Sequence, residues 1–240
     1  MEYVRRAIIM AAGTGSRMMP LTANIPKPLV SVMGKPMIET AIQGLRQNGI
    51  NEVYIVTGHL REQFGYLEEK YPGVSLLYNP YYRETNNISS LYAARNYIEN
   101  AMILDGDQMI NNKLVLSPET EKSGYNCVWT DVETKEWLLT VENGIVTKCS
   151  RSGGTAGWQL YSISRWTKED GRKLRRHLEI EFEQKNHKQI YWDDVALFCY
   201  PEEYRLGIKP MRAQDVTEID SLEELIRIDK TYEKYAGNAV

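Results

Sequence analysis

Cysteine and histidine are scarce in this 240-residue sequence, and their placement argues against several kinds of functional site. The three cysteines, Cys127, Cys149 and Cys199, are odd in number and lack metal-binding spacing, which argues against a disulfide framework and a zinc site. The three histidines are scattered and suggest no catalytic triad. Because reduced thiols are typical of the cytoplasm, we expect a cytoplasmic protein.

The sequence also lacks a long apolar run and an excess of basic residues. No apolar run approaches the roughly 18 residues of a membrane span, and the start lacks a signal-peptide pattern. The net charge of −3 argues against a nucleic-acid-binding protein, which usually has a basic surplus. The densest basic cluster, Arg172–Arg176, is more typical of the solvated face of a helix. We therefore expect neither membrane insertion nor a nucleic-acid partner.

A glycine loop near the N-terminus carries the strongest functional signal. Residues 7–28 read AIIMAAGTGSRMMPLTANIPKP, an apolar run followed by small residues, an arginine, and a lysine between two prolines. Small residues let backbone N–H groups approach a phosphate closely. Arg17 and Lys27 add positive charge to the same loop. This combination suits a site that holds a nucleoside triphosphate and stabilises negative charge.

Two other glycine-rich phosphate-binding motifs do not fit this loop. A dinucleotide fingerprint needs a third glycine where this chain has Met18, and an acidic residue roughly 20 positions later. A Walker A loop needs Gly-Lys-Ser/Thr, whereas Gly34-Lys35 is followed by Pro36. An ordinary tight turn between a strand and a helix would explain the glycines, but not the arginine, prolines and lysine that accompany them.

The loop resembles the signature of the nucleotidyltransferase family, the pyrophosphorylase-like enzymes that join a nucleotide to a phosphorylated small molecule. The family pattern is Ala-Ala/Gly-Gly-x-Gly-(Ser/Thr)-Arg-(x)-x-Pro-Leu-Thr, with Pro-Lys a few residues later, and every element is present. The resemblance implies that Arg17 holds the β- and γ-phosphates that leave. It implies that Lys27 contacts the α-phosphate or the attacking phosphate. It also implies a nucleotide-binding set made of Ala11, Ala12, Gly13, Thr14, Gly15, Ser16, Ser89, Ser90 and Asp105.

The order of strands and helices in the first half indicates an α/β fold. Apolar strands alternate with helices there, which is typical of a parallel sheet flanked by helices. The predicted strands lie at 5–11, 53–57, 74–78 and 102–104, and the predicted helices lie around 38–45, at 62–70 and after Asn86-Asn87.

The pattern changes after Asn111, where strands follow one another. Strands are predicted at 126–130, 137–141, 145–148 and 156–163, with Asn143-Gly144 as a hairpin turn. Helices follow at 167–184 and about 193–200, and Ser221-x-x-Glu224 is a capping box that opens a last helix through Ile228. We predict one Rossmann-like nucleotidyltransferase domain over residues 1–240, with a mixed, mainly parallel central sheet and a small substrate lobe. Residues from 1 to about 111 would bind the nucleotide, and those from about 112 to 240 the acceptor.

Two acidic segments predict a magnesium site. Parallel sheets bind ligands at the carboxyl ends of their strands, and Asp105-Gly106-Asp107 follows a predicted strand. Carboxylate oxygens at that edge suit Mg²⁺, although an Asx turn explains the segment about as well when it is taken alone. By the family resemblance, Asp107 is a metal ligand and Asp220, just before the last helix, supplies the second carboxylate. The expected cofactor is therefore Mg²⁺.

Aromatic residues in the second half suggest a cationic acceptor. Glu136-Trp137 and Tyr191-Trp192-Asp193 combine aromatic rings with carboxylates, the usual cage for a quaternary ammonium group. Core packing is the alternative for any single tryptophan. These elements narrow the resemblance to the bacterial CTP:phosphocholine cytidylyltransferases. That resemblance implies CTP and phosphocholine as substrates, with Trp137, Tyr191, Trp192 and Asp193 binding the acceptor.

Two other functions stay open from the sequence. The acceptor could be 2-aminoethylphosphonate or a sugar 1-phosphate, although a primary amine would favour carboxylate partners over an aromatic cage. The chain could also be an inactive nucleotide-sensing homologue, which would be expected to lose Arg17, Lys27, Asp107 or Asp220; all four are present. No side chain distinguishes cytosine from other pyrimidines, and the sequence leaves a homodimer possible.

Overall fold

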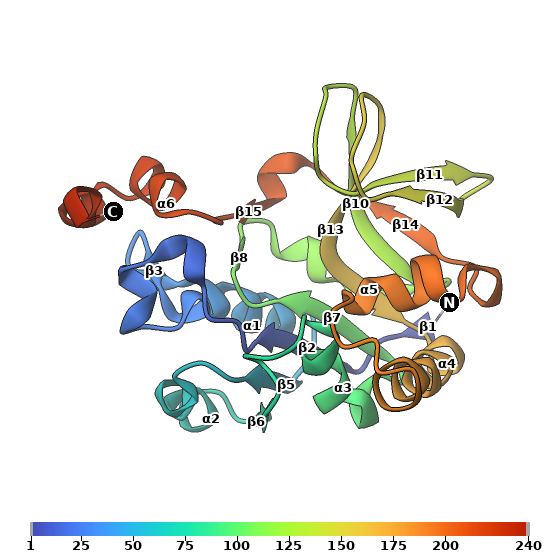
Figure 1. Ribbon diagram of the computed structural model, residues 1–240, viewed down its shortest axis with the longest axis horizontal. Coiled ribbons are helices and arrows are strands. Elements are labelled where there is room, and N and C mark those ends of the chain that lie inside the picture. The colour runs from blue at the N-terminus through green and yellow to red at the C-terminus, as the bar shows by residue number, and fades with distance from the viewer. Residues whose placement is uncertain (1, 239–240) are drawn as a thin grey trace.

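Strand β2 (Arg6–Ala11) lies in the middle of a nine-stranded mixed sheet in the computed structural model, which describes residues 2–238. It is flanked in parallel by β5 (Glu52–Thr57) and β7 (Ala101–Asp105), and β6 (Val74–Tyr78) extends the parallel part beyond β5. The long strand β13 (Gly157–Trp166) runs antiparallel to β7 and joins this part to the rest of the sheet (Figure 1). The predicted mixed, mainly parallel α/β architecture is confirmed.

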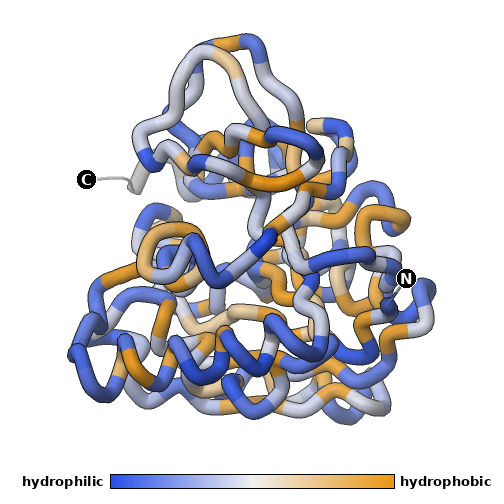
Figure 2. Tube along the Cα trace, turned by 90° about the vertical axis from the view of Figure 1, so that its right-hand side faces the viewer, coloured by the Kyte–Doolittle hydropathy of each residue, from blue (hydrophilic) through white to orange (hydrophobic). Residues whose placement is uncertain are grey.

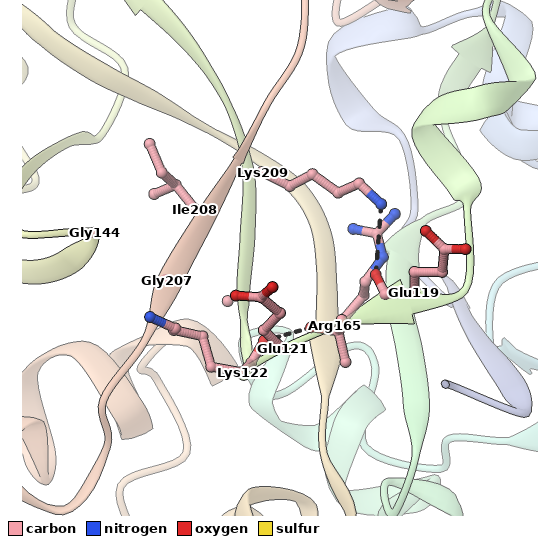
Figure 3. Close-up of a pocket in the computed structure, with 10 residues that line it drawn as sticks. Glu119, Glu121, Lys122, Gly144, Arg165, Gly207, Ile208 and Lys209 are labelled. Carbon is pink, nitrogen blue, oxygen red and sulfur yellow. Dashed lines mark hydrogen bonds between the residues drawn. The ribbon is translucent and has the colours of Figure 1, made fainter. Parts of the chain in front are cut away.

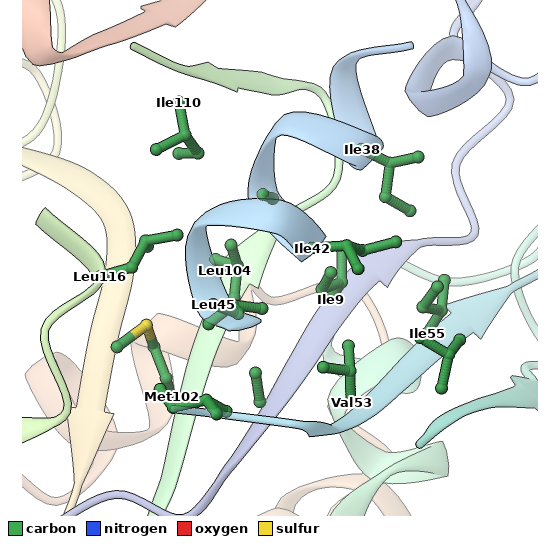
Figure 4. Close-up of a cluster of buried hydrophobic side chains, with 14 of the residues drawn as sticks. Ile9, Ile38, Ile42, Leu45, Val53, Ile55, Met102, Leu104, Ile110 and Leu116 are labelled. Atoms are coloured by element: carbon green, nitrogen blue, oxygen red, sulfur yellow. The ribbon is translucent and has the colours of Figure 1, made fainter. Parts of the chain in front are cut away.

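Both faces of the parallel strands are covered, so β2 is apolar at every position after Arg6. Alternate side chains of β2 point to opposite faces: Ile9 packs under helix α1 (Met37–Gln47), whereas Ile8 packs on the side of α3 (Ile88–Ala93) and α4 (Lys168–Glu179). The cluster under α1 is drawn in Figure 4. In Figure 2 the helical turns change between hydrophilic and hydrophobic colours along the chain, as expected for helices with one buried face. This two-sided burial is what stabilises the parallel sheet.

The second half builds the predicted small lobe, which rises above the parallel strands in Figure 1. Asn143 and Gly144 both have positive φ, 50° and 74°, as a two-residue hairpin turn requires. The lobe contains β10 (Gly124–Thr130), β11 (Leu138–Glu142), β12 (Ile145–Ser150) and β14 (Gly207–Pro210) around the first part of β13. The strand β14, which pairs in parallel with β10, is absent from the prediction because its four residues show no apolar alternation.

Several predicted helices are shorter or less regular than the sequence indicates. The segment 62–70 is divided into a 3₁₀ turn, Arg61–Phe64, and helix α2 (Tyr66–Lys70). The segment 167–184 forms α4 and then a π-helical turn at Ile180–Gln184. The segment near 193–200 forms α5 (Trp192–Asp194), followed by a π-helical turn at Val195–Cys199. Whereas 3₁₀ turns are frequent at helix ends, π-helical turns are rare and usually a single turn long, and no sequence pattern predicts them here.

The C-terminal part folds back over the loop that follows β2. The capping box is confirmed: Ser221 Oγ accepts from Glu224 N at 3.2 Å, and helix α6 (Leu222–Ile228) begins there. Leu222 and Leu225 pack with Met18 and Met37 in a cluster of their own. The remaining short strands are β1 (Glu2–Tyr3), β3 (Ser31–Val32), β4 (Lys35–Pro36), β8 (Gln108–Ile110), β9 (Glu119–Thr120) and β15 (Val216–Glu218). Among residues 2–238, no helix has the length and apolar character needed to cross a membrane.

Candidate active site

The glycine loop leaves the carboxyl end of β2 and turns sharply at Gly15. Gly15 has φ 65°, in the left-handed region that favours glycine. A Cβ at this position would lie 2.9 Å from Cγ2 of Thr22 and 3.1 Å from Cβ of Lys27. Thr22 Oγ1 in turn donates a hydrogen bond to the carbonyl oxygen of Gly15 at 2.8 Å. The glycine therefore lets the segment that carries Lys27 fold directly against the loop.

Lys27 bridges the two predicted metal carboxylates. Its Nζ donates to Asp107 Oδ2 at 2.7 Å and to Asp220 Oδ1 at 2.8 Å, and the residue is only 6% exposed. Burial alone would lower the pKa of Lys27, but the two carboxylates outweigh burial and raise it. Burial alone would raise the pKa of Asp220, but Lys27 and Arg17 outweigh it and lower that pKa. The lysine is therefore a positive charge held between the carboxyl groups of Asp107 and Asp220.

A pair of short strands brings these groups together from distant parts of the sequence. Strand β8 starts directly after Asp107 and pairs with β15, so that Gln108 lies opposite Glu218, two residues before Asp220. Arg17 Nη2 donates to Asp220 Oδ1 at 2.8 Å. Neither strand is predicted from the sequence, although both bear directly on the site. The pairing of β8 with β15 therefore brings Asp107 and Asp220, which lie far apart in the sequence, close enough for both to bind Lys27.

A cleft of about 430 Å³ opens over this cluster at the carboxyl ends of β2 and β7. Most of the residues predicted from the glycine loop line it. They are Ala11, Ala12, Gly13, Gly15, Ser16, Arg17 and Lys27, joined by Ser90, Asp105, Asp107 and Asp220. The volume and the convergence of charged side chains are typical of a small-molecule site.

Two predicted nucleotide-binding residues lie outside the lining of this cleft. Thr14 is exposed and does not line it. Ser89 is only 1% exposed; its Oγ accepts from Asn79 Nδ2 at 2.8 Å and donates to the carbonyl oxygen of Asn86 at 3.0 Å. Ser89 therefore holds the start of α3 in position, while its neighbour Ser90 lines the cleft.

A second cavity of about 260 Å³ adjoins the cleft and shares Arg17, Asn87, Asp105 and Asp220 with it. Trp137, Tyr191 and Asp193 line this cavity, as the sequence predicts for an acceptor pocket. The rings of Trp137 and Tyr191 lie 5.7 Å apart at 83°, so they form a corner of two aromatic surfaces. Burial raises the pKa of Asp193 to about 7, and the charge of Asp194 adds to this effect.

Trp192 lies in the core rather than in this cavity, contrary to the prediction. It is 1% exposed and packs against Trp166 and Tyr125, with ring centroids 6.0 and 6.2 Å away. Its backbone N–H donates to Asn87 Oδ1 at 2.9 Å, and the Asn87 side chain does not cap α3. Tyr191 and Trp192 are neighbours in sequence, but the entry into α5 turns the first toward the cavity and the second into the core.

Contacts that no sequence pattern predicts hold the aromatic corner of Trp137 and Tyr191 in place. Asp194 Oδ2 accepts from the backbone N–H of Tyr191 at 2.8 Å, and its Oδ1 accepts from Arg151 Nε at 2.9 Å. The Arg151 guanidinium carbon lies 3.7 Å from the ring centroid of Phe198, which packs edge-on against Trp137. Arg151 belongs to a turn without a recognisable pattern, so its role emerges only from the structure.

Two carboxylates that line this second cavity are also missing from the predicted site residues. Glu136 and Glu218 both line the 260 Å³ cavity. Glu136 belongs to the Glu136-Trp137 element of the sequence, and Glu218 lies two residues before the predicted metal ligand Asp220. Adjacency to those motifs is the signal that would have found them. The cavity therefore combines an aromatic corner with an unusually acidic wall.

The chemistry of the two aspartates fits a hard divalent cation. Both carboxylates converge on one point, which the Lys27 ammonium now approaches within hydrogen-bond distance. Within residues 2–238, however, no three His, Cys, Asp or Glu side chains gather closely enough to hold a metal. A pair of carboxylates suits Mg²⁺, which commonly takes its other oxygens from substrate phosphates and water.

Comparison with known proteins gives consistent matches over most of the chain. The profile of the nucleotidyl transferase family matches residues 6–136. The chain is 38% identical over 229 residues to a 2-aminoethylphosphonate cytidylyltransferase of Lancefieldella rimae, covering 94% of this chain and 92% of that one. It is 32% identical over 225 residues to a choline-phosphate cytidylyltransferase of Streptococcus pneumoniae, covering 94% and 97%. A solved structure of the Streptococcus pneumoniae CTP:phosphocholine cytidylyltransferase matches with a TM-score of 0.87 and 32% identity, covering 94% and 98%.

Proposed function

The chain belongs to the nucleotidyl transferase family, and we propose that it is a cytidylyltransferase that joins CMP from CTP to phosphocholine, giving CDP-choline and pyrophosphate. The cytidylyl part of this proposal is supported by relatives named for that activity over more than 90% of the chain. The choice of phosphocholine rests on one observation, the corner formed by Trp137 and Tyr191 beside Asp193. A trimethylammonium group has no N–H to donate, so aromatic faces and nearby negative charge are its best partners.

The reaction is an in-line displacement at the α-phosphorus of CTP. A phosphate oxygen of the acceptor forms a new P–O bond, and the bond from the α-phosphorus to the bridging β-oxygen breaks, so that pyrophosphate leaves. The acceptor phosphate is already ionised, so the protein needs no strong general base. Its contribution is to position the two substrates and to stabilise the developing charge. Arg17 would hold the leaving phosphates, and Lys27 would contact the α-phosphate or the attacking phosphate.

Asp107 and Asp220 would hold Mg²⁺ in this proposal. The ion, when bound, neutralises phosphate charge and orients the reacting groups. We expect Asp107→Asn and Asp220→Asn each to raise the Mg²⁺ concentration for half-maximal rate by roughly threefold to fivefold, because each removes one anionic ligand while substrate phosphates supply others. A Mg²⁺ titration of the initial rate measures this. An unchanged half-maximal concentration in both variants would mean that the metal binds elsewhere.

A second candidate acceptor is 2-aminoethylphosphonate. The acidic wall of the pocket favours it, because Glu136, Asp193 and Glu218 could all accept hydrogen bonds from a primary ammonium group. The relative from Lancefieldella rimae is also named for that acceptor. The two candidates differ in two chemical features at once: the methylation of the nitrogen, and the linkage of the phosphorus through oxygen or carbon.

A four-acceptor experiment separates these features. Initial rates with CTP would be compared for phosphocholine, phosphoethanolamine, 2-aminoethylphosphonate and its N-trimethyl derivative. We expect the two trimethylated acceptors to have the higher kcat/KM whichever linkage they carry. A preference for the two primary amines would overturn the phosphocholine proposal, and a higher kcat/KM for the phosphonate of that pair would favour 2-aminoethylphosphonate. Faster turnover of a sugar 1-phosphate with UTP or dTTP, tested in the same assay, would overturn the cytidylyltransferase assignment itself.

Acceptor binding should depend on pH through Asp193. Because its pKa is raised to about 7, this carboxyl is mostly neutral at pH 6 and mostly ionised at pH 8. An ionised Asp193 attracts a cationic head group, so we expect the acceptor KM to be roughly threefold higher at pH 6 than at pH 8, since other carboxylates share the attraction. The acceptor phosphate also titrates near this range. Measuring acceptor KM against pH in Asp193→Asn corrects for the titration of the phosphate. If acceptor KM depended on pH equally in the wild type and in this variant, a role for Asp193 would be contradicted.

A further inference from the structure

A separate cavity of about 400 Å³, drawn in Figure 3, lies near the start of β7, at the opposite end of that strand from the candidate active site. Arg165 of β13 lines it and pairs with Met102 near the start of β7, whereas the active-site residue Asp105 ends that strand. Lys122 and Lys209 supply two further cations, and Glu119 and Glu121 supply carboxylates. Neither the predicted site nor the proposed reaction uses any of these residues.

Arg165 brings a buried positive charge that has only neutral partners. The residue is 2% exposed, and its Nε, Nη1 and Nη2 donate to Ser117 O, Asn126 Oδ1 and Val115 O at 2.8, 2.6 and 2.6 Å. A guanidinium has five N–H groups, so two remain after these three bonds. No Asp or Glu oxygen of residues 2–238 lies within 4.0 Å of its nitrogens. Buried charges are normally paired, so this arrangement lacks an anion.

Lys209 lies beside Arg165 and, among residues 2–238, also forms no ion pair within 4.0 Å, although the nearby charge of Glu119 favours its charged form. In Figure 3 its ammonium approaches the guanidinium, and its strand pairs with β10 so that Lys209 is opposite Asn126, the partner of Arg165. Its hydrogen bond, to the carbonyl oxygen of Glu119, is long at 3.5 Å. Burial, followed by the charge of Arg165, lowers the pKa of Lys209 to about 8. Two cations held together in this way favour binding of an anion between them.

The volume of the cavity, about 400 Å³, accommodates such an anion, and two glycines of its lining let a cationic side chain lie along the wall. Gly124 and Gly207 lie directly opposite each other on β10 and β14, and a Cβ on Gly207 would lie 2.8 Å from the Lys122 side chain. Lys122 therefore extends along a wall free of side chains. The three cations exceed the two carboxylates of the lining, so the cavity is locally positive in a chain of net charge −3.

We propose that this cavity is a second ligand site, which binds a phosphate group of a small molecule between Arg165 and Lys209, with Lys122 at its rim. Donors that approach from several side chains suit a tetrahedral oxyanion with many acceptor oxygens better than a planar carboxylate. The site lies outside the reaction centre, so its ligand need not be a substrate or a product.

Inorganic phosphate is the probe for this proposal. The melting temperature of the full chain would be measured against phosphate concentration at constant ionic strength and pH 7, where Lys209 is charged. Phosphate also enters the nucleotide cleft, so the informative quantity is the difference between Lys209→Met and a matched control, Lys148→Met, which changes an exposed lysine of β12. We expect Lys209→Met to weaken the apparent phosphate affinity by roughly fivefold, since one charge-assisted hydrogen bond is lost. The control should behave like the wild type.

Two outcomes would overturn the second site. One is equal phosphate stabilisation of Lys209→Met and Lys148→Met. The other is reproduction of the wild-type effect by sodium chloride at the same ionic strength, because that would be charge screening alone. Unchanged kcat and KM for CTP in Lys209→Met would verify that the variant is folded and that the active site is intact. If Lys209→Met does not fold, Lys209→Gln and Lys122→Met provide the same comparison.

Discussion

Replacing Lys27 with alanine should lower kcat by roughly 10²–10³-fold, the scale seen when a preorganised group that stabilises transition-state charge is removed. Lys27 is 6% exposed and is held by Asp107 and Asp220, so its charge is positioned before substrate binds. A preorganised charge costs little reorganisation as the phosphoryl bond breaks. The measurement is kcat at saturating CTP, acceptor and Mg²⁺, since an effect on kcat reports an interaction made in the transition state.

The control for this variant must separate lost catalysis from lost folding. Removing Lys27 leaves Asp107 and Asp220 close together without their shared cation, which destabilises the apoprotein. The melting temperature should therefore be recorded with Mg²⁺ present, beside Lys35→Ala, which changes an exposed lysine that donates to Gln43. We expect Lys35→Ala to retain wild-type turnover. A folded Lys27→Ala protein with wild-type kcat would exclude Lys27 from catalysis.

Replacing Trp137 with alanine should raise the acceptor KM by roughly tenfold, since an aromatic contact with a desolvated cation is worth about 1–2 kcal/mol. The loss removes one of the two surfaces of the aromatic corner and leaves Tyr191 alone. The KM for CTP should change much less, because the cleft lined by the glycine loop does not include Trp137. Both KM values and the melting temperature would be measured on the same preparation.

Core packing is the competing explanation for Trp137, and it predicts a different pattern. Trp137 also contacts Phe198, so its loss as a core residue would lower the melting temperature and leave both KM values nearly unchanged. Trp129→Ala is the matched control: Trp129 is 54% exposed and packs edge-on against Trp158, and it does not line the acceptor cavity. A change in acceptor KM of the same size in Trp129→Ala would remove the support for a specific role of Trp137.

Local patterns were sufficient to predict the parallel strands of the sheet and the chain's family. The apolar run of β2 predicts a strand buried on both faces, because each residue of such a strand must fit a hydrophobic layer on one side or the other. The capping box at Ser221 depends on four consecutive residues and is found as predicted. The nucleotidyltransferase resemblance of the glycine loop is confirmed by the family match over residues 6–136. The roles of the individual site residues stay predictions.

Features that depend on distant contacts could not be predicted in the same way. Lys27 and Asp220 are separated by 193 positions in the sequence, and the pairing of the short strands β8 and β15 helps to bring them together. The sequence of neither strand predicts this pairing. Arg151 and Asp194, 43 positions apart, support the aromatic corner through a contact between two irregular segments.

Tyr191 and Trp192 illustrate the physical reason most directly. Both are large aromatic residues within two positions of Asp193, so composition does not distinguish them. Burial in the core beside Tyr125 and Trp166 takes the larger apolar surface of Trp192 out of water and leaves Tyr191, 48% exposed, at the cavity. Sequence alone determines which residue types are present and the local structure they favour. Which of two neighbouring side chains meets the ligand is decided by packing against segments far away along the chain.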